Sequence, residues 1–287
     1  MEELATIYEF LKKDLKPLFW NRFSKDNIFN CHITSAYSKC YEFNVLVNKE
    51  NDISNSFFYS PALRGICEDV IVLKFFKKQT KLNSNKIIEH FMMIQLIDIS
   101  DRQKEFFLKN NPQQIVFEYP NAGKVREENT NAIKEEWLKI GLNREKVFPS
   151  TSQMATDSGL VELYNYLYSA TSDMVHFSPH VLMRAGWSKK DDEFLHEFST
   201  KNFSKYYKLF NQFYGAYLFV LFNESFKKEL KIPKAIVELV KQIKVIISDE
   251  YRWPELITFE EMNHPDAHKI KTINMIRKIK ARIRGKN

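Results

Sequence analysis

Glycine is scarce in this chain, which has 7 glycines among 287 residues. Average usage of about 7% would give roughly 20. Glycine supplies at little cost the positive φ angles that tight turns between strands need, so a fold with many hairpins is disfavoured. Apolar residues instead recur at helical spacing, beginning with Leu4, Ile7, Tyr8, Leu11 and Leu15. Together these features predict an all-α fold, a multi-helix bundle.

Two long segments have the composition of core helices. The segment from Ser199 or Thr200 to Phe226 should lie at the centre of the core, because aromatic residues repeat along it: Tyr206, Phe210, Phe213, Tyr214, Tyr217 and Phe222. A second helix should run from about 84 to 110, with a core face made of Ile87, Phe91, Ile94, Leu96 and Ile97.

Ser and Pro pairs mark further helix starts, because Ser accepts early backbone N–H bonds and Pro fits the first turn. Ser60-Pro61 is expected to open one helix, and Pro149-Ser150 a short one that closes near Gly159. A longer helix should follow from 160 to about 177. The alternation over 181–198 also allows one small β-hairpin, turning at 189–192. We expect one helical bundle domain over 1–262 and a basic C-terminal helix over 263–287.

The composition, 44% apolar and 28% charged, is that of an ordinary globular protein. Three cysteines, Cys31, Cys40 and Cys67, form no metal-binding or disulfide pattern, which favours a reducing cytoplasm. The first residues lack the pattern of a secretory signal, and no apolar stretch is long enough to span a bilayer. We therefore expect a cytoplasmic protein without a membrane partner.

Positive charge is concentrated at the C-terminus. Residues 269–287 contain eight Lys or Arg and no acid, which leaves 35 basic and 36 acidic residues in the rest of the chain. Isoleucines at spacings of three and four predict an amphipathic helix. Two interpretations are open: a docked terminal helix with a solvated charged face, or a helix that binds RNA or another polyanion. The candidate nucleic-acid contacts are Lys269, Lys271, Arg277, Lys278, Lys280, Arg282 and Arg284.

Arg64 and Glu68 lie four residues apart, so they share one face of the helix expected from residue 60. They can form an ordinary structural ion pair. Alternatively, the carboxylate of Glu68 orients the guanidinium of Arg64, whose planar fork of donors then binds a phosphate or another anion.

A second polar stripe repeats every four residues over Tyr164, Tyr168, Ser172 and His176. Because histidine titrates near neutral pH, His176 can act as a general acid or base beside Ser172. It can equally be a structural histidine that caps the end of the helix. Both interpretations stay open from the residues alone.

The combination of these elements resembles an uncharacterised family of bacterial all-helical proteins. The resemblance rests on Arg64, Glu68, Pro149, Ser150, Tyr164, Tyr168, Ser172 and His176. More distantly, the chain is similar to the HEPN superfamily, helical bundles in which an Arg and a His act in metal-independent RNA cleavage. HEPN proteins carry Arg and His four to six residues apart on one helix, and no pair here has that spacing. This resemblance therefore implies that Arg64 and His176 converge from different helices.

The resulting hypothesis is a bacterial defence or toxin-like protein that acts on RNA as a metal-independent ribonuclease. Its candidate catalytic residues are Arg64, Glu68, Ser172 and His176. The alternative is a non-catalytic helical module that binds an anionic ligand or a protein partner. We expect no metal and no cofactor, because the Glu-x-x-His spacings at 193–196 and 261–264 lie in a hairpin and beside a proline. RNA, an operon-encoded protein and a second copy of the chain are the partners considered.

Overall fold

The computed structural model describes residues 3–19, 25–49, 53–79, 81–141, 147–186, 198–250, 252–258 and 276. Every regular element in these ranges is helical, which confirms the all-α prediction. Within them no helix is sufficiently long and apolar to cross a membrane. The predicted boundary between 262 and 263 lies outside the described residues and stays a prediction.

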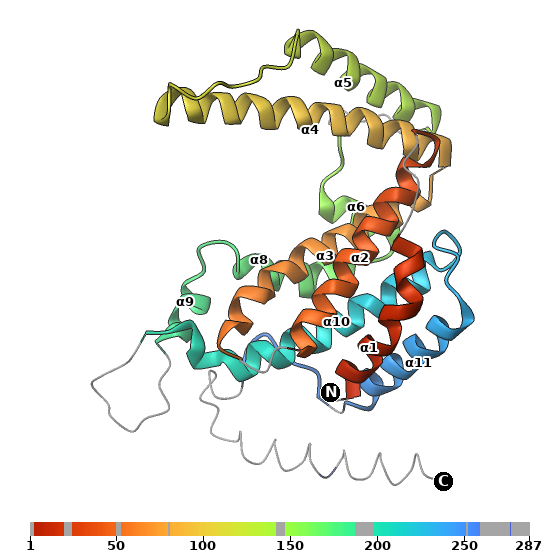
Figure 1. The fold of residues 1–287 in the computed structure, drawn as a ribbon, viewed down its shortest axis with the longest axis vertical. Helices are drawn as coiled ribbons and strands as arrows, with labels where there is room; N and C mark the ends of the chain where they lie inside the picture. The colour runs from red at the N-terminus through yellow and green to blue at the C-terminus, as the bar shows by residue number, and fades with distance from the viewer. Residues whose placement is uncertain are drawn as a thin grey trace. The chain divides into compact units, whose positions relative to one another are not determined.

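The chain forms two compact units (Figure 1). The first contains Met1–Phe19, Tyr37–Cys67 and Leu163–Asn287, and the second contains Trp20–Ala36 and Glu68–Glu162. The longer helices are α1 (Glu3–Leu15), α2 (Ile28–Lys49), α3 (Ser56–Lys77), α4 (Lys81–Asn110), α5 (Ala122–Lys139), α10 (Ser204–Phe226) and α11 (Lys234–Asp249). The shorter elements are α6 (Thr151–Ser158), α7 (Val161–Leu163), η4 (Tyr164–Tyr168), α8 (Ser169–Asp173), α9 (Pro179–Ala185), and the 3-10 turns η1 (Lys16–Phe19), η2 (Lys25–Asn27), η3 (Ile53–Asn55) and η5 (Thr200–Phe203).

Helix α10 forms the core of the first unit, as its aromatic residues predict. Most of its aromatic side chains are almost fully buried: Tyr207, Phe210, Phe213, Phe219, Phe222 and Phe226. Polar bonds fix its position against α2: the Tyr37 hydroxyl donates to Asn223 Oδ1 at 2.9 Å, and Asn44 Nδ2 donates to the Gly215 carbonyl at 3.0 Å. The glycine permits this approach, because a Cβ there would lie 2.8 Å from the Phe43 ring.

In the second unit, α4 and α5 lie side by side and run antiparallel (Figure 1). The direction follows from their paired residues: Asn83 bonds to Glu136, His90 to Asn129, and Asp98 to Arg126. Between them Ile87, Ile94 and Ile97 are buried. Leu96 was predicted on the same face but is exposed, because it lies two residues, or about 200°, from Ile94.

Several local predictions need correction. Helix α3 begins at Ser56, four residues before the predicted start, and contains Pro61. The predicted hairpin is replaced at its start by α9, which Pro179 opens in the first turn; the turn at 189–192 lies outside the described residues. The short helix α6 has its predicted ends: Ser150 accepts a bond from the Gln153 N–H, and Gly159 closes the helix with a φ of 70°.

Candidate functional site in the tyrosine-rich segment

The tyrosine-rich segment is not the continuous α-helix that its spacing predicts. Residues Tyr164–Tyr168 form a π-helical turn between α7 and α8. The backbone N–H of Ser169 reaches back five residues to the Tyr164 carbonyl, and its hydroxyl bonds to the same oxygen at 3.1 Å. Such single π turns occur frequently at functional sites. The extra residue in the turn changes which side chains share a face.

The π turn places two tyrosine rings face to face. The centroids of Tyr164 and Tyr168 lie 4.8 Å apart with an angle of 19° between the ring planes. Both side chains are partly buried. The hydroxyl groups at the edge of this stack can form hydrogen bonds with another side chain.

Arg64 comes from α3 to meet this stack. Its Nη2 donates to the Tyr168 hydroxyl at 3.1 Å, and its Cζ lies 5.1 Å from the centroid of the same ring. Its Nε is buried and has no hydrogen-bond partner among the described residues. A buried donor without an acceptor costs on the order of 1–3 kcal/mol, so Arg64 keeps unused capacity to bind an anion.

Ser172 and His176 lie beyond this contact. Ser172 is in α8, and its carbonyl accepts the N–H groups of Val175 and His176, each at 3.0 Å. These bonds close the helix, so His176 stands in the turn that follows it. The imidazole is exposed and makes no hydrogen bond to any residue in the described ranges. Its exposure leaves it accessible to a substrate.

Glu68 belongs to the second unit and has a different partner. Thr151 Oγ1, at the first residue of α6, donates to Glu68 Oε1 at 3.1 Å. The structure therefore holds Arg64 through Tyr168 and connects Glu68 with the Ser150-capped helix. The orientation of Arg64 by Glu68 stays a prediction, and the bond that Arg64 makes is to Tyr168 of the tyrosine-rich stripe.

The predicted nucleic-acid contacts between Lys269 and Arg284 lie outside the described residues. Ile276 is the one described residue of that segment; it is helical and exposed. Among the residues that the structure describes, no group of three or more His, Cys, Asp or Glu side chains is arranged to hold a metal ion.

Arg184 is a buried cation that the sequence analysis missed. It is only 3% exposed, and its Cζ lies over the rings of Phe203, Tyr206 and Tyr207 at 5.3, 4.7 and 5.8 Å. It donates to the Leu256 carbonyl. Because its partners lie far along the chain, no short-range pattern could reveal this role.

Three tyrosine hydroxyls bond to the backbone beside Leu256, whose carbonyl is the partner of Arg184. Tyr166 and Tyr214 both donate to the Pro254 carbonyl, at 3.0 and 2.7 Å, and Tyr206 donates to the Glu255 carbonyl at 2.7 Å. Burial, with a smaller contribution from Tyr166, raises the pKa of Tyr214 well above its usual value. These groups stabilise residues 252–258 and have no spare donor for a ligand.

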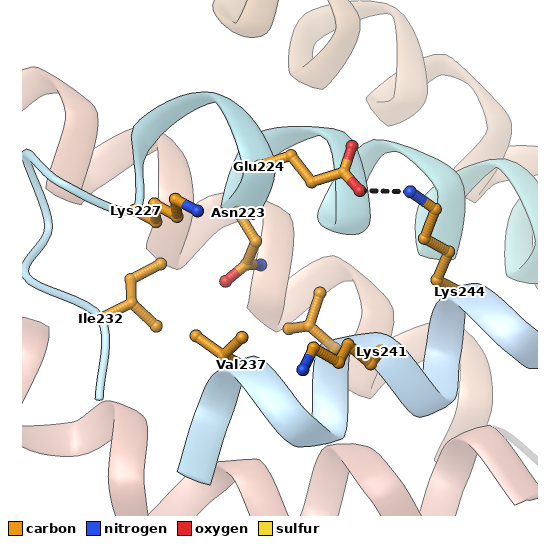
Figure 2. Close-up of a pocket in the computed structure, with 8 residues that line it drawn as sticks. Asn223, Glu224, Lys227, Ile232, Val237, Lys241 and Lys244 are labelled. Atoms are coloured by element: carbon orange, nitrogen blue, oxygen red, sulfur yellow. Dashed lines mark hydrogen bonds and ion pairs between the residues drawn. The ribbon is translucent and has the colours of Figure 1, made fainter. Parts of the chain in front are cut away.

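A separate pocket of about 220 Å³ lies between the end of α10 and α11 (Figure 2). Its lining combines an apolar floor with a charged rim: Asn223, Glu224, Lys227, Ile232, Val237, Val240, Lys241 and Lys244. Glu224 pairs with Lys244 at 2.5 Å and Glu238 with Lys241 at 2.8 Å, so Lys227 is the lining lysine without an acidic partner among the described residues. The sequence analysis did not identify this pocket, because it needs two helices to form.

Residues 26–194 match DUF5677, a family of unknown function, and this range is more than half of the chain. The chain belongs to DUF5677. The match confirms the expectation of an uncharacterised family; its range includes Arg64 and His176, and the residue motif expected for the family stays a prediction. No curated protein and no solved structure matches the chain significantly. For this DUF5677 protein the HEPN relationship stays a prediction.

Proposed function

We propose that this DUF5677 protein acts on RNA as a metal-independent ribonuclease in a bacterial defence or toxin-like role. The observation that carries the proposal is the contact between Arg64 and Tyr168, residues 104 positions apart that meet at a π turn. The sequence hypothesis required Arg64 to converge with His176, and the contact with Tyr168, four residues before Ser172, supports that convergence.

In the proposed reaction, Arg64 binds the phosphodiester that is cleaved. Tyr168 holds one edge of the guanidinium, while the buried Nε gains an acceptor if the side chain turns towards the phosphate. Positive charge at that position stabilises the extra negative charge of the transition state. Ser172 donates a hydrogen bond to substrate, and Glu68 supports α3 through Thr151 rather than through Arg64.

His176 serves as the general acid or base. As a base it removes the proton from the ribose 2′-hydroxyl, which attacks the adjacent phosphorus to form a 2′,3′-cyclic phosphate, while the departing 5′-oxygen of the next nucleotide takes a proton from water. This chemistry needs an accessible imidazole, and the exposure of His176 is consistent with that requirement. The basic segment from Lys269 to Arg284 supplies affinity for the RNA backbone.

The decisive test is RNA cleavage by the full chain in the presence of EDTA, with His176→Ala compared to His180→Ala. General acid–base catalysis contributes about 10²- to 10⁴-fold, so His176→Ala should lose at least 100-fold in cleavage while its melting temperature is unchanged. His180 is also exposed and close in sequence, so His180→Ala should cleave normally. Equal activity of both variants, or no cleavage by the wild type, would contradict the proposal.

The role of the basic segment has its own test. Removing 269–287 should abolish most RNA retention and flatten its salt dependence, because each phosphate contact to a single strand contributes a slope of about −0.7. Binding to an RNA matrix is measured between about 50 and 200 mM salt. A truncated chain with the same slope as the full chain would show that the segment is not the electrostatic element.

A second candidate function is supported by the pocket between α10 and α11. Its apolar floor and lysine rim suit a small amphipathic anion, as a non-catalytic binding module would require. Octanoate is a suitable probe, because it joins an acyl chain for the apolar floor to a carboxylate that can pair with Lys227. Saturating octanoate should raise the melting temperature of wild type but not of Lys227→Glu. Equal behaviour of the two proteins would end this alternative.

A further inference from the structure

Helix α4 is apolar on two opposite faces. One face is occupied by α5, and its seam runs through His90, Ile94 and Ile97. The other face carries residues placed two positions later, which turns them about 200° away. These side chains are exposed: Met92 39%, Leu96 52%, Ile99 58% and Phe106 61%. We call these four residues the outer stripe.

The outer stripe has the spacing of a coiled-coil seam. Steps of four and three lead from Met92 through Leu96 to Ile99, and two further steps through Gln103 reach Phe106. Sustained 4-3 spacing lets one helix pack against another along its length. Solvated faces of surface helices are normally polar, so an apolar seam that the described residues leave exposed is a candidate interaction surface.

The charge of this region restricts the partner. Residues 81–141, which contain α4 and α5, have nine basic and nine acidic side chains, whereas 269–287 has eight basic and none acidic. A neutral surface has no general attraction for a polyanion such as RNA. Because both signs of charge are mixed along α4, this helix can instead pair with the same helix of a second copy.

We infer that two copies of the chain pair through the outer stripe of α4, with the two helices antiparallel. A two-fold interface uses the same patch on both copies, and a stripe centred on Ile99 is self-complementary in that arrangement. Antiparallel pairing places Glu89 of one copy near Lys109 of the other. Parallel pairing would place two Glu89 side chains at the same level, where like charges repel.

The expected affinity is modest. One helix seam buries less than the roughly 800 Å² per partner of a standard stable interface. Association in the micromolar range is therefore the expected outcome. The inference does not depend on RNA cleavage, so either proposal can fail without the other.

Sedimentation of the full chain from about 1 to 200 μM provides the first test. Wild type should shift from monomer to dimer over this range. The double variant that carries both Leu96→Asp and Ile99→Asp should stay monomeric with an unchanged melting temperature. The matched control is Val245→Asp, an equally exposed apolar position on α11, which should dimerise normally. A wild type that is monomeric at 200 μM, or a double variant that still dimerises, would overturn the inference.

Cysteine cross-linking tests the direction of the helices. In a Cys31→Ser background, Ile99→Cys should form a disulfide between two copies on oxidation. Met92→Cys and Phe106→Cys should each stay unlinked alone and link to each other when mixed. Self-linking of Met92→Cys with itself would show a parallel pair and overturn the antiparallel arrangement.

Discussion

Helices α10 and α4 are both long and rich in apolar residues, but only α10 is covered on nearly all sides. In α10, buried aromatic residues occur around the helix, whereas α4 buries one face and exposes the outer stripe. Periodicity therefore identifies which side chains share a face, and it does not say what covers that face. The difference gives α10 a role in stability and leaves α4 free for association.

The largest expected effect is on the free energy of unfolding when a core residue of α10 is truncated. Phe222→Ala should lower the free energy of unfolding by about 3–5 kcal/mol, because Phe222 is fully buried against Tyr37 and Phe226. Leu96→Ala, on the outer stripe, should change it by less than about 0.5 kcal/mol in the monomer. Urea unfolding below the dimerisation range measures both. Comparable losses for the two variants would mean that α4 is covered like α10.

The next largest expected effect is a loss of stability of the first unit at alkaline pH. Burial raises the pKa of Tyr41 to about 12 and raises that of Tyr8 and Tyr37 further. Above pH 10 the unfolded chain loses tyrosine protons that the folded chain retains, so stability falls as pH rises from 10 towards 12. Each such proton contributes a slope of about 1.4 kcal/mol per pH unit.

Far-UV circular dichroism during urea unfolding at pH 8, 10 and 11 measures this decline. A Tyr41→Phe variant should show a smaller decline, because it removes one of the groups that titrate only in the unfolded chain. A variant as sensitive as wild type would exclude Tyr41 from the effect.

Much of the fold was predictable because its signals are local. The aromatic repeat of α10 and the caps of α6 depend on residues within one helix. The misread hairpin had a local signal too: Pro179 follows Ser178 and lies in the first turn of α9, a position that suits proline. The alternating pattern over 181–198 predicted a hairpin, but the proline-led helix start before it decides the structure over 179–185.

The site was predictable only in part, because its contacts are not local. The sequence predicted that Arg64 and His176 converge. In the structure Arg64 bonds to Tyr168, eight residues before His176, and the convergence itself stays a prediction. The π turn depends on which carbonyl the Ser169 N–H selects, and composition carries no signal for that choice. The rings around Arg184 and the helix pair that forms the pocket are likewise set by tertiary packing.

Gly215→Ala, in the buried helix α10, should lower the free energy of unfolding by an intermediate amount. A Cβ at this position would lie 2.8 Å from the Phe43 ring and 2.9 Å from Asn44 Oδ1, so these side chains or the helices that carry them must shift. Overpacking of this kind costs about 1–3 kcal/mol. Gly123→Ala, at the start of α5, is the control, because nothing lies within 4 Å of its added Cβ. Equal unfolding midpoints for the two variants would show that α2 and α10 are not tightly packed.

The smallest expected effect concerns the ion pair that joins α4 to α5. Asp98 and Arg126 form a salt bridge whose side chains are 25% and 50% exposed, so water and salt screen their attraction. A double-mutant cycle with Ala at both positions should give a coupling of about 0.2–1 kcal/mol at low salt, falling as salt increases. The same cycle for His90 and Asn129, which are partly buried at 2.8 Å on this interface, should depend less on salt. Equal salt sensitivity of the two couplings would mean that water and salt reach His90 and Asn129 as freely as they reach Asp98 and Arg126.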